Sequence, residues 1–205
     1  MASILDITLA MCLGGLLLLG ITNSNQVLIE NELLINNDML VQQMLISTAA
    51  LVEGEFRNMG MGVPEDSSTI LQAEEHRIMF LSDLARDGTS DKIEYWVGPL
   101  GEIPNIQNDS LRLLHRRVNN GSTESIGMVS KFILRYFSQS EMDTLSMPVA
   151  AADLEMIKIV EITMEIQNPS AMYRDTRDIL PGERNALFSS SYWRQTRLAS
   201  QNLKR

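Results

Sequence analysis

Few side chains in this sequence have types and spacings that could do chemistry. The two histidines are His76 and His115, and the pair Glu74–Glu75 directly precedes His76, a grouping that could hold a metal ion. The alternative is that this charged run begins a strand that faces water. His115 alternates with Leu111 and Leu113, which predicts a half-buried histidine on the inner face of a sheet.

The other candidates for reactive chemistry are a cysteine and a group of acids. Cys12 is the only cysteine, so neither an intrachain disulfide nor a Cys-based zinc site can form, and its apolar surroundings make the thiol a small hydrophobe. Glu141, Asp143 and Asp153 could help to hold calcium, but they lack the ligand spacing of a known calcium loop. The sequence has no Gly-rich phosphate loop, no G-x-S-x-G elbow and no H-E-x-x-H motif. We therefore expect no catalytic residue, metal or cofactor, and a protein that is not an enzyme.

The composition indicates a folded and acidic protein. Hydrophobic residues make up 44% of the 205 residues, and the net charge is −9. Phosphate binding needs clustered Lys and Arg, so nucleic acid is not an expected partner. No Lys or Arg precedes Arg57, whereas basic residues outnumber the single acid Glu183 after Pro181. This acidic front and basic tail could attract each other between subunits, or form two separately solvated faces.

An apolar run near the start is the first element that the sequence predicts. From Ile4 to Ile21 only Asp6 is charged, and only Thr8 is otherwise polar. A membrane-spanning helix needs about 20 mostly apolar residues, so this run is slightly short for a span. A signal peptide is the competing interpretation, but no basic residue precedes the run and no A-x-A pattern closes it.

The helical pattern continues beyond this run. No proline occurs before Pro64, and good helix formers dominate from Gln26 to Phe56. Apolar residues recur at spacings of four and seven, which predicts one apolar face, and a second set widens that face. The first set is Ile29, Leu33, Leu40, Met44 and Leu51, and the second set is Leu34, Val41, Leu45 and Val52. With an end near Gly60 and Gly62, the helix would be about 80–85 Å long. We expect its first half to be covered by membrane or by other copies.

Asp6 is the one charge in the apolar run. An unpaired carboxylate at the centre of a membrane span costs at least about 2.5–3.5 kcal/mol. One interpretation places Asp6 at the interface, near the chain start, where it stays hydrated. The other interpretation pairs it with a cation from a neighbouring subunit. If Met1 is removed, Asp6 becomes the fifth residue and Ala2 the amino terminus.

With these residues the N-terminal segment resembles that of the type IV pilin and type II secretion pseudopilin superfamily. There the mature chain starts with a hydrophobic helix whose fifth residue is acidic and neutralises the amino terminus of an adjacent subunit during assembly. The resemblance implies that Asp6 and Ala2 are the assembly residues. It also implies a filament-core surface and glycines that make the helix flexible. The filament-core residues are Ile4, Leu5, Ile7, Leu9, Leu13, Leu16, Leu17, Leu18 and Leu19, and the glycines are Gly14, Gly15 and Gly20.

The downstream chain is similar to the larger minor pilins and the wide-headed minor pseudopilins. The similarity lies in the order of segments: GEFRNMGMGV, IMFLSDLARDG, DKIEYWVG, LRLLHRRVNNG, VSKFILRYF, an isoleucine-rich strand and YWRQTRLASQNLKR. Asp6 stands where the family usually has glutamate, and Ala2 where it usually has an aromatic residue. The expected partners are other copies or related subunits, an inner-membrane assembly platform and, before assembly, the lipid bilayer. The expected location is the bacterial inner membrane, with the head in the periplasm or outside, followed by a periplasmic or extracellular filament.

Beyond a linker at residues 62–68, alternating patterns predict the strands of a β-rich head. The alternation is clearest around Ile78, Ile93, Phe132 and Val160. Ile157 and Ile159 are out of phase with the positions that follow, which predicts a bulge near Ile159 or a strand buried on both faces. Residues 138–153 and 175–183 are predicted loops, and residues 185–198 are predicted to form a short helix or an irregular strand.

The predicted fold class is therefore α+β, with a long N-terminal helix packed on an antiparallel β-sheet head. We assign residues 1–22 to a membrane-spanning or filament-core half of the helix, 23–62 to an amphipathic half and 65–205 to the head. Trp96, Tyr192 and Trp193 are predicted to be either anchors between subunits or ordinary core residues. The expected function is that of a structural filament subunit. The alternative is a single-pass membrane protein that does not polymerise and has an extracytoplasmic binding head.

Overall fold

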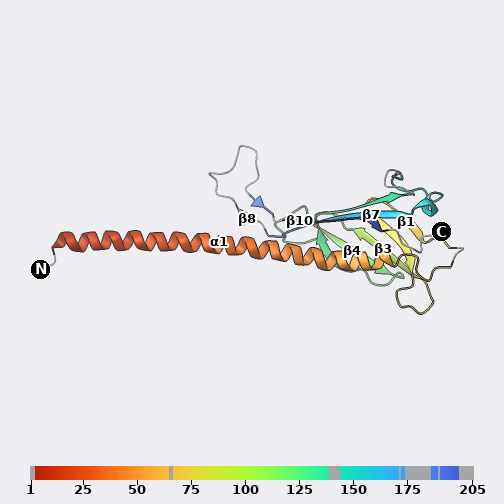
Figure 1. The fold of residues 1–205 in the computed structure, drawn as a ribbon, viewed down its shortest axis with the longest axis horizontal. Coiled ribbons are helices and arrows are strands. Elements are labelled where there is room, and N and C mark those ends of the chain that lie inside the picture. The colour runs from red at the N-terminus through yellow and green to blue at the C-terminus, as the bar shows by residue number, and fades with distance from the viewer. Residues whose placement is uncertain are drawn as a thin grey trace. The chain divides into compact units, whose positions relative to one another are not determined.

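The protein consists of one long helix and an antiparallel β-structure, as seen in a computed structural model (Figure 1). The structure describes residues 3–64, 67–138, 144–170, 172–173, 186–188 and 190–198. The chain divides into two units, Met1–Met39 and Leu40–Arg205. The second unit contains the C-terminal part of the helix and every described strand.

The helix α1 spans Ile4–Arg57 and has 54 residues. It forms because the segment holds no proline, whose ring would interrupt the backbone hydrogen bonds. It ends in a tighter turn, in which the Asn58 N–H donates to the Glu55 carbonyl at 3.1 Å. Gly60 and Gly62 follow with φ values of 78° and 71°, a region that glycine adopts without strain. The predicted long helix and its end near these two glycines are confirmed.

Two antiparallel sheets form most of the head. The first sheet has the strand order β1-β2-β3-β4-β5, and the second has the order β10-β7-β6. The first comprises β1 (Ile70–Ala73), β2 (Arg77–Ser82), β3 (Asp91–Val97), β4 (Arg112–Val118) and β5 (Glu124–Val129). The second comprises β6 (Lys131–Phe137), β7 (Ile159–Gln167) and β10 (Ser190–Leu198). A short pair, β8 (Met172–Tyr173) with β9 (Ala186–Leu187), and a 3-10 turn, η1 (Leu154–Met156), complete the described elements. The predicted α+β class with antiparallel strands is confirmed.

The predicted alternation places the apolar side chains of β2, β3, β6 and β7 correctly. Ile78 and Phe80 of β2, for example, are fully buried, because alternate residues of a strand share one face. β7 begins at Ile159 and buries residues on both faces, including Glu161 and Ile162. Of the two alternatives for this segment, the strand buried on both faces is therefore correct.

Three less regular segments were predicted as two loops and a short helix or irregular strand. The end of the chain predicted as a short helix or an irregular strand contains the strand β10, whose pairing with β7 shifts between Gln195 and Leu198. The predicted loop at residues 138–153 is exposed over most of its described part, with Val149 as a buried exception. The other predicted loop, at residues 175–183, lies outside the described residues.

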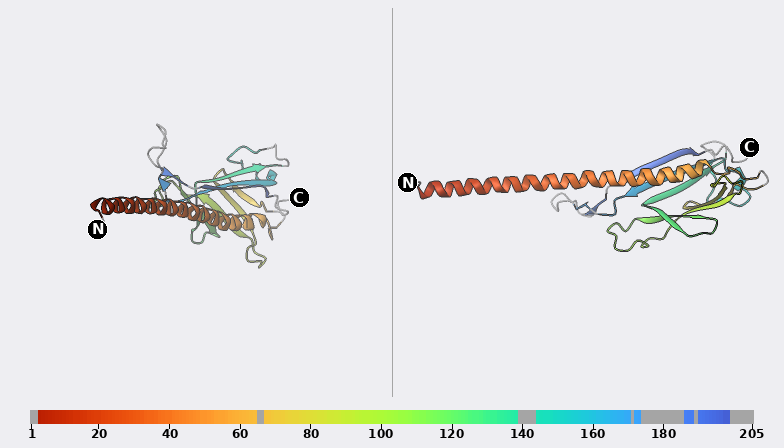
Figure 2. Two further views of the ribbon diagram at one scale, coloured as in Figure 1. Left: turned by 60° about the vertical axis from the view of Figure 1, so that its left-hand side comes forward. Right: turned by 90° about the horizontal axis from the view of Figure 1, so that it is seen from below.

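One hydrophobic core joins the end of α1 to both sheets, and the strands gather along this end of the helix in each view of Figure 1 and Figure 2. The Phe56 ring lies edge-on to the rings of Phe80 and Tyr95, with centroid distances of 5.3 and 5.4 Å. A Cβ added at Gly127 of β5 would lie 2.7 Å from the Thr48 hydroxyl oxygen, so the helix approaches this strand closely. The helix residues in the core are Val41, Leu45, Val52 and Phe56.

The apolar face predicted for the helix is offset from the face that the strands cover. Leu40 and Leu51, from the set expected to define the face, are 45% and 41% exposed. Val41 and Val52, from the set expected only to widen it, are 1% and 0% exposed. The prediction was wrong by one residue, or about 100° around the helix axis. Both sets satisfy the helical spacing, so periodicity alone could not decide between them.

Candidate assembly surface and the contacts beside it

The apolar surface of α1 in the first unit is the strongest candidate for a functional surface. The predicted filament-core residues are 55–83% exposed wherever the structure describes their side chains. These residues are Ile4, Ile7, Leu9, Leu13, Leu16, Leu17, Leu18 and Leu19, while the side chain of Leu5 lies outside the described part. Burying one such side chain contributes about 1.5–3 kcal/mol, so any apolar partner that covers this surface is strongly favoured.

The three predicted flexibility glycines lie on the same exposed helix. A Cβ added at Gly14, Gly15 or Gly20 would meet nothing within 4 Å. The helix backbone is therefore accessible to an incoming partner at these positions. By length and composition α1 can also cross a membrane, and the most apolar 18-residue window of the described helix contains no buried residue. Signal sequences pass the same test, so this finding alone does not distinguish a span from a signal sequence.

Asp6 has a partner within its own chain. Its Oδ2 accepts a hydrogen bond from the Ser3 N–H at 3.0 Å, and the Asp6 N–H donates to the Ser3 carbonyl at 2.9 Å. Ser3 directly precedes the first helical residue, and an acid three positions later that accepts from the Ser3 N–H supplies the carboxylate half of a capping box. Sequence reasoning missed this role, although the pattern S-x-x-D was visible. Ala2, the other predicted assembly residue, lies outside the described residues.

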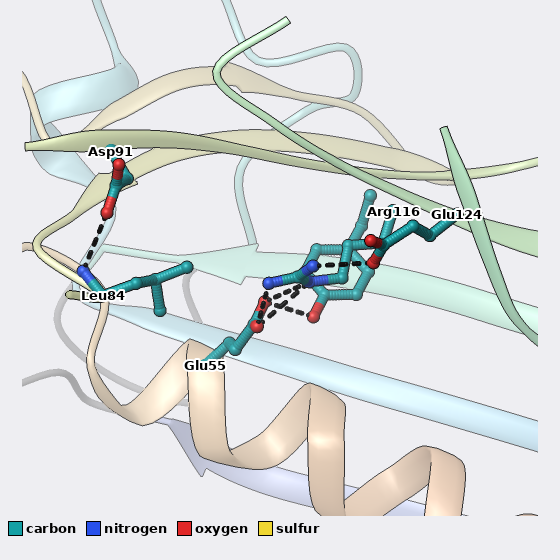
Figure 3. Close-up of polar contacts among 6 residues, drawn as sticks. Glu55, Leu84, Asp91, Arg116 and Glu124 are labelled. Atoms are coloured by element: carbon teal, nitrogen blue, oxygen red, sulfur yellow. Dashed lines mark hydrogen bonds and ion pairs between the residues drawn. The ribbon is translucent and has the colours of Figure 1, made fainter. Parts of the chain in front are cut away.

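In the second unit a buried charge cluster fastens α1 to the first sheet. Arg116 of β4 lies between Glu55 of α1 and Glu124 of β5 (Figure 3). Its Nε lies 3.0 Å from both Glu55 oxygens, and its Nη1 lies 3.0 Å from Glu124 Oε2. The Tyr95 hydroxyl donates to Glu55 Oε2 at 2.5 Å. The side chains of Glu55 and Arg116 are only 11% and 16% exposed, so their pair is mostly withdrawn from water.

The electrostatics of this cluster keep its donors protonated. Hydrogen bonding to Glu55 raises the pKa of Arg116 above its ordinary value, which outweighs the opposing effect of burial. Burial raises the pKa of Tyr95, and the negative charge of Glu55 raises it further. Both groups therefore keep the protons that they donate to Glu55. Removing one member would leave a buried charge without its partner, which is strongly destabilising.

The opposite face of the first sheet, called the outer face below, carries a second charge cluster. Glu94 of β3 forms ion pairs with Arg77 of β2 and Arg117 of β4, and its side chain is 2% exposed. Burial opposes the charged form of Glu94, but hydrogen bonds from the two guanidinium groups outweigh it, so the pKa of this carboxyl lies below its ordinary value. Arg116 and Arg117, adjacent in sequence, thus pair with acids on opposite faces of the sheet.

His115 is buried, but on the face opposite to the predicted one. It pairs across the strands with Trp96, and the two rings stack with centroids 5.2 Å apart. Its Nε2 lies 2.9 and 3.0 Å from the two carboxylate oxygens of Glu102. The inner-face prediction was wrong because Leu114, rather than Leu113, is the leucine of β4 that enters the core.

His76 lies in the turn between β1 and β2 and helps to join the two sheets. Its Nδ1 is 2.7 Å from the Phe132 carbonyl oxygen, and the adjacent Glu75 carbonyl accepts from the Leu134 N–H at 2.8 Å. The prediction that this charged run begins a strand is confirmed, because β2 starts at Arg77, and Glu75 is exposed as expected; His76 itself is only partly exposed. No group of three or more His, Cys, Asp or Glu among the described residues could hold a metal ion. Glu141 and Asp143, considered for calcium, lie outside them.

The three large aromatic residues are placed differently from one another. Trp193 packs, partly buried, against the core. Tyr192 is 60% exposed, and the ammonium group of Lys131 lies 5.7 Å from its ring centroid. Trp96 lies on the outer face, where the guanidinium carbon of Arg117 is 5.4 Å from its ring centroid. Only Trp193 therefore fits the prediction of an ordinary core residue.

Comparison with known proteins adds no assignment, because no family model, curated protein or solved structure matches this chain.

Proposed function

We propose that this chain is a structural subunit of a filament of the type IV pilin and pseudopilin kind, assembling through the apolar part of α1. The observation that carries the proposal is the exposure of the apolar residues between Ile4 and Leu19. Lipid covers this surface before assembly, and the helices of other copies or related subunits cover it afterwards. The subunit is a minor one, inserted in the bacterial inner membrane and drawn by an assembly platform into a periplasmic or extracellular filament.

The head supports this assignment through its chemistry. Its buried acids Glu55 and Glu94 are held in ion pairs, and His76 and His115 have structural partners. These residues serve the packing of the head. These four side chains hold the head together, and the helix exposes a long apolar surface. Such a surface is typical of a protein that assembles with partners.

Asp6 has two successive roles in this proposal. Before assembly its carboxylate caps the helix through Ser3, as the structure shows. During assembly the same charge pairs with the amino terminus of a neighbouring subunit. The capping bond is local and is worth roughly 0.5–2 kcal/mol, so a charge pair formed in an apolar environment can replace it.

The two roles of Asp6 can be separated by substitution. Asp6→Gln removes the charge but keeps a side chain that can complete a capping box, and Asp6→Glu keeps both functions. We expect Asp6→Gln to reduce recruitment into filaments at least tenfold and Asp6→Glu to retain it, with equal helix content by circular dichroism. Recruitment is measured in the sheared filament fraction, and contact between copies by cross-linking the native thiol of the exposed Cys12. A Cys12→Ala variant controls for cross-linking elsewhere.

One observation favours a second candidate, the single-pass membrane protein that does not polymerise. The Ser3–Asp6 capping box accounts for the carboxylate without a neighbouring subunit. This candidate predicts that Asp6→Gln behaves like the wild type and that Cys12 forms no cross-linked dimer in membranes. That pair of results would replace the filament proposal.

A further inference from the structure

The part of α1 that belongs to the second unit exposes apolar side chains on the face opposite the core. Leu40, Ile46 and Leu51 are 45%, 69% and 41% exposed. A helix at a protein surface normally carries charged residues on its outer face, but no charged residue occurs between Asp38 and Glu53. We call this face the stripe, and its residues are Leu40, Gln43, Ile46, Ser47, Ala50, Leu51 and Gly54.

Lipid that covers the start of α1 does not reach the stripe. The hydrocarbon core of a bilayer is about 30 Å thick and covers about 20 residues of a helix. A bilayer that covers Ile4–Ile21 therefore ends well before Leu40. An apolar surface that lies in water is typical of a protein interface, so we expect another protein surface to cover the stripe.

The strand β4 carries a guanidinium group that lacks a counter-charge within the described chain. Nε of Arg112 is buried and has no hydrogen-bond partner among the described residues. Each of the other arginines on the strands of the first sheet, by contrast, forms an ion pair with a glutamate; these are Arg77, Arg116 and Arg117. A charged group with an unsatisfied buried atom is costly, so Arg112 calls for an acid from outside the described chain.

The register of β4 places Arg112 on the face of the sheet that packs against α1. Arg112, Leu114 and Arg116 alternate along the strand and so share one face. Arg116 pairs with Glu55, and the β5 partner of Leu114 closely approaches Thr48. Going from Arg116 to Leu114 thus follows α1 toward its N-terminus, and Arg112 comes next in this direction. Arg112 therefore lies beside the N-terminal part of the stripe.

Residues 27–38 of α1 have the chemistry that fits this surface. The large apolar side chains of this segment are 40–64% exposed. Its charged residues are Glu30, Glu32 and Asp38, and no Lys or Arg precedes Arg57 that could pair with them along the helix. Glu30, Leu34 and Asp38 recur at a spacing of four and so lie on one helix face. This face combines an apolar residue with two acids, as a partner for the stripe and Arg112 requires.

We propose that residues 27–38 of a second copy pack on the stripe, with Leu34 against its apolar side chains and the acids Glu30 and Asp38 beside Arg112. The inference rests on the proposed filament function and names a second contact between its subunits, outside the membrane-spanning run. The two surfaces differ from each other, so each copy offers one surface to the copy before it and the other to the copy after it. Such a contact between unlike surfaces extends into an open filament when the rotation does not close into a ring.

The test places one cysteine on each surface, in two differently tagged full-length copies that both carry Cys12→Ala. Ser47→Cys lies on the stripe of one copy, and Leu34→Cys lies on the packing face of the other. Oxidation in membranes should give a mixed dimer. Its yield should exceed at least fivefold that of a control pair, Leu71→Cys with Leu34→Cys, since Leu71 is 40% exposed on β1, away from the helix.

Charge variants test the pairing with Arg112. Arg112→Glu in the stripe copy should lower the yield of mixed dimer at least fivefold. Glu30→Arg or Asp38→Arg in the other copy should restore the yield, and restoration also shows that the Arg112→Glu head is folded. Arg86→Glu, at an exposed loop position, is the matched control and should leave the yield unchanged.

A charge placed on the stripe tests its apolar contact. Ala50→Glu should lower the yield of mixed dimer at least fivefold, because packing would bury the new carboxylate. Gln42→Glu adds the same charge at an exposed position of α1 outside the stripe, and it should retain the dimer. Both positions are exposed, so neither variant should disturb the fold of the head.

Cross-linking at the native Cys12 and recovery of sheared filaments report on the proposed function separately. If these succeed while the Ser47→Cys and Leu34→Cys copies give no more mixed dimer than the control pair, this inference is wrong and the filament proposal stands. The inference is also wrong if the mixed dimer persists with Arg112→Glu. If the mixed dimer forms in membranes but no filaments are recovered, the packing is correct and the filament proposal is wrong. Absence of both contacts contradicts both proposals.

Discussion

The two units of the chain contain similar apolar side chains, which are exposed in the first unit and buried in the second. In the first unit, leucines of α1 such as Leu17 are mostly exposed, whereas in the second unit Val52 and Phe56 of the same helix are completely buried. The acids differ in the same way. Among the described residues Asp6 is held by its own helix start, whereas Glu55 is held by residues of two strands. Apolar composition alone therefore does not distinguish a core from an interaction surface; the distinction lies in whether strands are available to cover it.

The largest expected difference in stability between the two units comes from replacing one apolar side chain in each unit with alanine. Phe56→Ala should lower the free energy of unfolding of the head by about 4 kcal/mol, because it leaves a cavity among packed rings. Leu17→Ala should change it by less than about 0.5 kcal/mol, because that side chain makes no contribution to the core. Urea unfolding of the full chain in detergent, followed by tryptophan fluorescence, measures both. Equal destabilisation by the two variants would contradict the comparison.

A smaller effect is expected from two glutamates at the end of α1. Glu55→Gln should lower the free energy of unfolding by about 3 kcal/mol, because the largely buried Arg116 loses its buried counter-charge and keeps only the pair with the exposed Glu124 among its described ion pairs. Glu53→Gln is the matched control, since Glu53 lies on the same helix and pairs with Arg57 at 2.5 Å on the surface. It should cost less than about 1 kcal/mol, and the same urea titration measures it. If the two variants cost the same, the buried cluster is not what fastens the helix.

The sequence could predict the elements but not their pairing. Helix length, helix end and strand phase follow from local features, such as the absence of proline and the alternation around Ile78. The contacts of Glu55 and His115 join residues 61 and 13 positions apart, so no local spacing reveals them. One feature of the sequence did point to the Glu55 contact. Glu55 lies directly before Phe56 and three residues after Val52, so it is on the helix face that is buried. A charge on a buried face requires a partner. The capping box at Asp6 was equally visible as a local pattern.

His115 was predicted on the inner face of the first sheet, and the error comes from a local pattern that was extended too far. His115 alternates with both Leu111 and Leu113, but Leu111 lies just before β4 and is buried there as part of the loop's end. Alternation counted across the start of a strand therefore assigned the wrong phase. A residue just outside a strand need not follow the alternation of the strand, because only residues within the strand point to its two faces in turn.

The smallest expected effect concerns Glu94 and the response of the head to acid. Its pKa is lower in the folded state than in the unfolded chain, so ionised Glu94 contributes stability above its ordinary pKa of about 4.5. That contribution is lost as the pH falls through the folded-state pKa, because the protonated carboxyl no longer attracts Arg77 and Arg117. Urea unfolding between pH 7 and pH 3 should therefore show a steeper loss of stability for the wild type than for Glu94→Gln. Glu155→Gln, at an exposed position, should keep the wild-type slope, and the ion pairs of Glu94 would be irrelevant to stability if all three slopes coincided.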